Sequence, residues 1–120
     1  MNDYDLVLKE FGISPSQADA IIQNMADQVG MPRESLVEVK PSTIHGQGIF
    51  VTQDVFAGTL LVMARIAGFR TPAGRYTNHE RSPNSLMVKD RAGDIQLVAM
   101  KDLTKGSEVT ISYRQSGRIR

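Results

Sequence analysis

The feature that most constrains the fold is a series of short apolar and β-branched runs that fills the chain after Pro32. Glycine, proline and aspartate separate the runs, which is typical of strands joined by tight turns. Residues 90–94 (DRAGD), between two such runs, have the composition of a hairpin turn. The runs lie at 36–39, 48–52, 59–67, 86–89, 95–100 and 109–113. The sequence therefore predicts a small, mostly β unit over residues 36–113.

The N-terminal region has a helical periodicity instead. Tyr4 to Phe11 carries apolar residues at the spacing of one helix face. A second helix is expected to begin near Pro15, where Ser14 can cap it and Gln17 can close a capping box. One apolar stripe follows, which we expect to be buried; it consists of Ala18, Ile21, Ile22, Met25, Ala26 and Val29. Residues 1–35 are thus predicted to form a helical hairpin packed on the β unit.

Length and composition bound the function classes. The chain has 120 residues and a formal net charge of +1, which fits one compact domain and disfavours nucleic acid as a partner. It has no cysteine, which excludes disulfides and structural zinc–thiolate sites. No apolar run is long enough to span a membrane, and the start has no features of a signal peptide. We expect a cytoplasmic or otherwise intracellular protein without a membrane partner.

Three segments carry the candidate site residues. Residues 75–84 (RYTNHERSPN) crowd polar and backbone-bending residues into one place, and residues 45–50 (HGQGIF) place two glycines before a strand. The third segment, residues 105–113 (KGSEVTISY), reads as a turn and a strand with Val109, Ile111 and Tyr113 on one face. Taken singly, the glycine pair is most often a plain turn, and a tyrosine that ends such a strand is most often a core residue.

The order and spacing of these three segments are more specific than any one of them. His-Gly-x-Gly, then Arg-Tyr-x-Asn-His-x-x-x-Pro-Asn, then Gly-x-Glu-Val-Thr-Ile-x-Tyr resembles the SET domain of protein lysine methyltransferases. The resemblance covers about residues 37–113 and implies a β-clip of short strands with a knot-like C-terminal core. It also implies a minimal member of the family, without the cysteine-rich zinc segments that flank larger SET domains.

The resemblance further implies a cofactor, S-adenosylmethionine, and assigns residues to it. The cofactor would lie against the glycine turn and the Asn-His segment, with Asn78 binding its methionine part. The full implied cofactor-binding set is His45, Gly46, Gln47, Gly48, Arg75, Tyr76, Asn78 and His79. Tyr113 is the implied catalytic residue, at the rim of a channel for a lysine side chain. No metal is expected, and His79 is expected to serve in structural packing.

Several positions depart from the family pattern. Glu80 and Arg81 replace the usual Ser-Cys, and the stretch between Gly58 and Arg75, which binds substrate in larger members, is short. Few aromatic side chains are available for a lysine channel; the candidates are Phe69, Tyr76, Tyr113, Tyr4 and Phe11. We therefore expect a homodimer, in which a second copy supplies part of the substrate groove. Residues 114–120 are expected to be a basic tail that frays into solvent.

The sequence favours an S-adenosylmethionine-dependent methyltransferase that acts on a lysine of a protein substrate. Two other functions stay open. One is a SET-like binding module without turnover, and the other is a different β-clip domain that binds a small carbohydrate or nucleotide. The carbohydrate- or nucleotide-binding domain would not bind S-adenosylmethionine. The SET-like binding module would show no methyl transfer, even with the cofactor bound.

Overall fold

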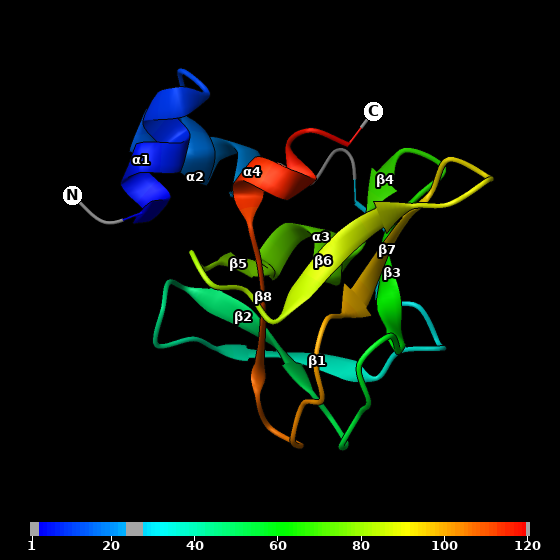
Figure 1. Cartoon of the computed structure of the whole chain (residues 1–120). Coiled ribbons are helices and arrows are strands. Elements are labelled where there is room, and N and C mark those ends of the chain that lie inside the picture. The colour runs from blue at the N-terminus through cyan, green and yellow to red at the C-terminus, as the bar shows by residue number, and fades with distance from the viewer. Residues whose placement is uncertain (1–2, 24–27, 120) are drawn as a thin grey trace.

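The computed structural model describes residues 3–23 and 28–119 and shows two four-stranded sheets with four short helices (Figure 1). The first sheet has the strand order β1-β2-β8-β5, and the second has the order β4-β3-β7-β6. The elements in chain order are α1 (Asp3–Glu10), α2 (Pro15–Gln23), β1 (Val37–Pro41), β2 (Gln47–Val51), β3 (Leu60–Ile66), β4 (Phe69–Arg70), α3 (Pro72–Tyr76), β5 (Asn78–His79), β6 (Ser85–Lys89), β7 (Ile95–Ala99), β8 (Glu108–Ile111) and α4 (Tyr113–Ser116).

The six strands predicted from the sequence are all present, and residues 90–94 connect β6 and β7 as expected. The turn closes through a backbone hydrogen bond from Asp90 to Asp94. β4, β5 and α3 were not predicted, because strands of two residues and a helix of five residues leave no readable periodicity. Both sheets contribute to one core, in which Ile49, Leu61 and Leu97 are fully buried.

The two N-terminal helices are confirmed, but their apolar stripe is only partly buried. Ser14 and Gln17 form the expected capping box, with each backbone N–H donating to the other side chain at 2.8 and 3.1 Å. Ala18 is buried, whereas Ile21 is 52% exposed and Val29 is 39% exposed. The expectation of full burial is therefore wrong for these two residues, since short helices cover only part of the sheet. Met25 and Ala26, and the side chain of Ile22, lie outside the described residues.

The C-terminal segment differs from the prediction. β8 ends at Ile111, and Tyr113 begins a helix, α4, instead of ending a strand. Ser112 caps this helix, because its hydroxyl accepts a hydrogen bond from the Gln115 backbone N–H. The Gln115 side chain then bonds both backbone groups of Met87 on β6, at 2.7 and 3.2 Å. The tail is thus held against the second sheet at least through Ser116, which corrects the expectation of fraying from residue 114.

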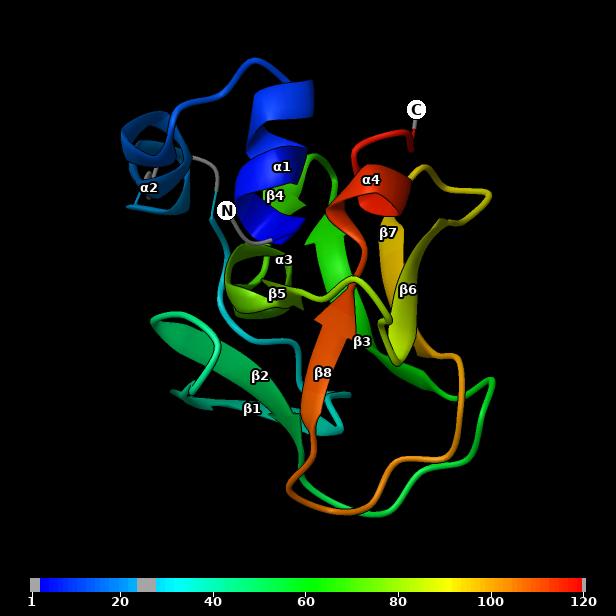
Figure 2. The ribbon, with the colours of Figure 1, turned by 60° about the vertical axis from the view of Figure 1, so that its left-hand side comes forward.

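The helices α1, α2 and α4 gather at one end of the molecule, above α3 and β5 (Figure 2). β5 pairs with β8 in parallel, with Asn78 opposite Thr110 and His79 opposite Ile111. This pairing brings the second and third sequence segments together at the end that the helices cover.

Candidate active site

The side-chain amide of Asn78 joins the segments that the sequence singled out. Asn78 Nδ2 lies 3.1 Å from the carbonyl oxygen of His45 and 3.2 Å from that of Gln47. It also lies 3.1 Å from Ser42 Oγ and 2.8 Å from Glu108 Oε2. Among the described residues, no donor bonds the other side-chain atom, Oδ1. The glycine turn and the Asn-His segment are therefore neighbours, as expected.

The two glycines of the turn are required for different reasons. Gly46 has a φ of 47°, a left-handed conformation that favours glycine. At Gly48 the limit is space, because a Cβ atom there would collide with the Glu108 carboxylate. The Glu108 carboxylate also accepts hydrogen bonds from Ser42 Oγ at 2.8 and 2.9 Å. A negative charge thus lies directly behind the turn.

Ser42 and Glu108 were not predicted as site residues. Glu108 belongs to the third motif, Gly-x-Glu, and this position in the motif is the one sequence signal that could have identified it as a site residue. Ser42 lies 36 residues from Asn78 in the chain, and nothing in the sequence around it marks a site. Both are positioned by strands, since Glu108 begins β8 and the loop from Ser42 to Gly46 closes through a backbone bond of 2.8 Å.

Both the backbone N–H and the side-chain hydroxyl of Tyr113 are hydrogen-bonded. Its backbone N–H donates to His79 Nδ1 at 3.0 Å, and its hydroxyl donates to the Thr77 carbonyl at 3.0 Å. The centroids of the Tyr113 and His79 rings are 5.1 Å apart. Burial raises the pKa of the Tyr113 hydroxyl above its ordinary value of 10.0. The hydroxyl therefore stays protonated at neutral pH and acts as a hydrogen-bond donor, not as a base.

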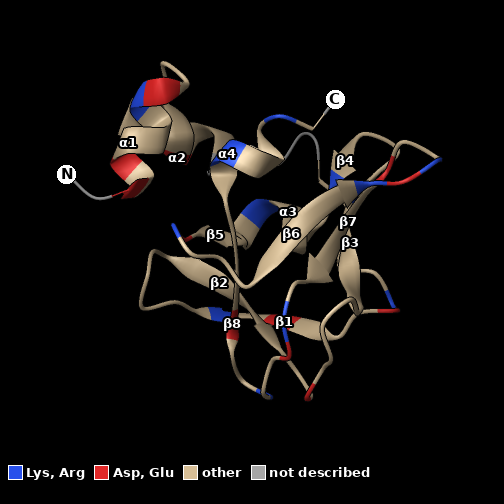
Figure 3. Cartoon of the chain, in the orientation of Figure 1, with Lys and Arg blue, Asp and Glu red and all other residues tan. Residues whose placement is uncertain are grey.

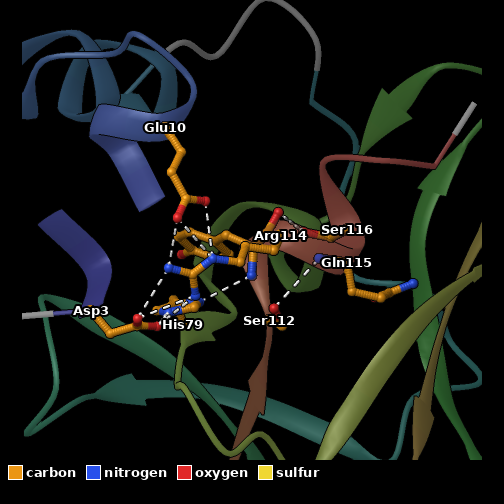
Figure 4. Close-up of polar contacts among 8 residues, drawn as sticks. Asp3, Glu10, His79, Ser112, Arg114, Gln115 and Ser116 are labelled. Atoms are coloured by element: carbon orange, nitrogen blue, oxygen red, sulfur yellow. Dashed lines mark hydrogen bonds and ion pairs between the residues drawn. The ribbon is translucent and has the colours of Figure 1, made fainter. Parts of the chain in front are cut away.

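The helix α1 contributes two further side chains to this region. The Tyr4 ring stacks on His45 at 6.0 Å between centroids and meets the Tyr113 ring edge-on at 5.8 Å. The Asp3 carboxylate bonds His79 Nε2 and the guanidinium of Arg114 (Figure 4). Tyr4 was a candidate for the channel, whereas no sequence signal pointed to Asp3.

A cavity of about 550 Å³ lies beside Tyr113 between the helices and the second sheet. Apolar residues of α1 and β6, including Leu8 and Met87, line it together with Tyr113 and Thr77. His79, Asn78 and the glycine turn are not among its lining residues. Tyr113 therefore borders the cavity with one part and the Asn-His segment with another.

Arg75 and Tyr76 lie on α3, and their predicted contact with a cofactor stays a prediction. The Arg75 guanidinium donates to Gln28 Oε1 at 3.0 Å and lines the cavity. Its carbon Cζ lies 4.7 Å from the centroid of the Tyr76 ring, which packs against the core. Phe69, another candidate for the channel, is 46% exposed on β4, whereas Phe11 lines the cavity.

Across the described ranges, no group of three or more histidine, aspartate or glutamate side chains is arranged to hold a metal ion. Within the same ranges, no helix is long and apolar enough to cross a membrane.

Known proteins resemble this chain over part of its length. The family model of the SET domain matches residues 62–114, which include the Asn-His segment, β8 and Tyr113. Over these residues the chain is similar to the SET domain family. A crystal structure of a Plasmodium falciparum protein, described as a "putative histone methyltransferase", has a similar fold with a TM-score of 0.55 and 16% sequence identity. The similarity covers 67% of this chain and 94% of the other chain. No curated protein matches the sequence.

Proposed function

We propose that this SET domain is an S-adenosylmethionine-dependent methyltransferase that acts on a lysine of a protein substrate. One observation carries the proposal, namely that the Asn-His segment lies between the glycine turn and Tyr113. The Asn78 amide bonds the turn at 3.1 and 3.2 Å, and His79 Nδ1 accepts from the Tyr113 backbone N–H at 3.0 Å. The family model covers part of this group, which supports the assignment.

The groups around Asn78 fit the amino-acid part of the cofactor. Asn78 Oδ1 can accept a hydrogen bond from an ammonium group, and the carbonyl oxygens of His45 and Gln47 lie beside the amide nitrogen of the same side chain. The Glu108 carboxylate supplies negative charge behind them. S-adenosylmethionine carries both an ammonium and a sulfonium, so this arrangement of acceptors complements its charge.

Bound S-adenosylmethionine would supply an electrophilic methyl group for direct transfer to an amine. The amine must be neutral, although free lysine has a pKa of about 10.4. Burial between α1 and the sheet would lower that pKa, because desolvation disfavours the charged amine. Tyr113 and the Thr77 carbonyl would orient the amine and exclude water from it. Since the Tyr113 hydroxyl stays protonated, the amine would lose its proton to solvent before the transfer.

A non-catalytic SET-like module is the alternative that a specific observation favours. Tyr4 of α1 contacts the His45 and Tyr113 rings, Asp3 of α1 bonds His79, and only 2% of the His79 side chain is exposed. If α1 stays in this position, a cofactor would have to share the space with it.

Two measurements test the proposal. S-adenosylhomocysteine is titrated by calorimetry, and a protein lysate is then incubated with the enzyme and S-adenosylmethionine carrying a labelled methyl group. We expect binding and labelled lysine in at least one protein. Binding without transfer would favour the non-catalytic module, and no binding would reject both.

A further inference from the structure

Asp3 lies at a junction between α1, β5 and α4. Its carboxylate accepts hydrogen bonds from the Arg114 guanidinium, with Oδ2 3.1 Å from Nη1 and Oδ1 3.2 Å from Nη2. The same carboxylate bonds His79 Nε2 (Figure 4). The Arg114 guanidinium and, after it, the His79 ring hold the pKa of Asp3 below its ordinary value. The carboxylate is therefore charged at neutral pH.

The two ring nitrogens of His79 form hydrogen bonds with different partners. A backbone N–H can only donate, so Nδ1 must accept the bond from Tyr113 and carries no proton. The ring proton of a neutral imidazole then lies on Nε2, where it faces Asp3. Because the His79 side chain is almost fully buried, Nε2–H would have no water to replace Asp3. The carboxylate thus favours the one tautomer that can hold the Tyr113 backbone.

Glu10 gives a natural comparison within the same helix. Figure 3 shows acidic residues at both ends of α1 and a basic residue on α4. Glu10 bonds Arg114 at 3.0 and 3.1 Å, as Asp3 does. In the described part of the chain, however, Glu10 does not bond His79. Both carboxylates therefore bond Arg114, but only that of Asp3 also bonds His79.

We propose that Asp3 is a positioning residue that holds Tyr113 in place through His79. The inference rests on the proposed function, in which Tyr113 orients the reacting amine. The Tyr113 hydroxyl and backbone N–H are its two anchors, on Thr77 and His79. Loss of the second anchor would let the first residue of α4 move, and a displacement of about 1 Å in a positioned group can lower a rate by about 100-fold. The N-terminal helix is then part of the active site, not only its cover.

The test compares three variants of the full chain: Asp3→Ala, Asp3→Asn and, as the matched control, Glu10→Gln. Asn keeps an oxygen that can accept from Nε2–H, and Glu10→Gln weakens the contact with Arg114 without touching His79. Three quantities are measured: hydrogen exchange of the Tyr113 amide by NMR, affinity for S-adenosylhomocysteine, and the rate of labelled methyl transfer to lysate proteins at saturating cofactor.

We expect Asp3→Ala to accelerate exchange of the Tyr113 amide and to lower the transfer rate, each by about tenfold or more. Affinity for S-adenosylhomocysteine should change by less than about threefold, and the other two variants should stay within about threefold of the wild type in all quantities. Such a fall in rate at constant affinity is not expected of a residue that only stabilises the fold.

Two results would overturn the inference: unchanged exchange of the Tyr113 amide in Asp3→Ala, or an equal loss of rate in Glu10→Gln. A wild type that binds S-adenosylhomocysteine but transfers no methyl group would reject the proposed function. Faster Tyr113 exchange in Asp3→Ala alone would, in that case, still support the positioning of Tyr113 by Asp3.

Discussion

The Asn78 amide lies 2.8 Å from the Glu108 carboxylate, across the parallel pair of β5 and β8. The two residues are 30 positions apart in the sequence, and each belongs to a different motif. Their contact explains why the motifs must occur together. The carboxylate orients the amide, and the amide ties the carboxylate to the turn of His45 and Gln47.

The first prediction concerns the affinity for the cofactor. Asn78→Ala should weaken the binding of S-adenosylhomocysteine by about 1.5–3 kcal/mol, since it removes a polar partner of a charged group. Asn84→Ala is the control, because Asn84 bonds the backbone of β8 at 2.8 and 2.9 Å and is expected to hold loops. It should lower the melting temperature with little change in the affinity of the folded protein. Equal affinities of Asn78→Ala and the wild type in calorimetry would reject the cofactor site.

The second prediction concerns packing of α3 against β3. A Cβ atom at Gly74 would collide with the Ala64 backbone carbonyl, so the helix cannot accept even a methyl group there. Gly74→Ala should lower the free energy of unfolding by about 1–3 kcal/mol. Gly30→Ala is the control, because no atom lies within 4 Å of the added Cβ. Urea unfolding of both variants measures the difference; a Gly74→Ala variant as stable as the control would contradict the packing.

Much of the fold could be predicted from sequence because its signals are local. The capping box of Ser14 and Gln17 and the turn of residues 90–94 depend on neighbours in the chain. The helix that begins at Tyr113 replaces a predicted strand end. The alternation of Val109 and Ile111 predicts that the strand continues to Tyr113, and the cap, Ser112, gives no separate signal. The contact of Asp3 with Arg114 spans 111 positions. Nothing local distinguishes these two charged residues from solvent-exposed ones.

The third prediction is a pH dependence of the contact that Asp3 makes. Its pKa in the folded protein is held below the ordinary value of 3.8, mainly by Arg114 and then by His79. Such a carboxylate stabilises the folded state above its unfolded pKa, and the contribution is lost as pH falls through the lower folded pKa. The melting temperature of the wild type should therefore exceed that of Asp3→Asn by a constant amount above about pH 5. The difference should shrink below about pH 4; a difference that grows on acidification would contradict the contact.

The fourth prediction concerns assembly. The chain between Gly58 and Arg75 holds only β3, β4 and the first part of α3, which leaves one copy little surface for gripping a peptide. We therefore propose that two copies form a symmetric dimer and complete the substrate groove. Sedimentation equilibrium at high micromolar concentration should give twice the chain mass of 13.2 kDa. A single species at the mass of one chain would exclude the dimer.

The last prediction separates the two roles of Tyr113. Tyr113→Phe keeps the ring beside His79 and the backbone bond to Nδ1, and it removes only the hydroxyl that donates to Thr77. The free energy of unfolding should fall by less than about 1.5 kcal/mol, the scale of one hydrogen bond. Affinity for S-adenosylhomocysteine should be retained, because the groups around Asn78 are unchanged. Labelled methyl transfer should fall by about 100-fold or more, since one positioned polar group contributes on that scale to catalysis. Transfer at the wild-type rate would mean that Tyr113 is only a packing residue and that another group orients the amine.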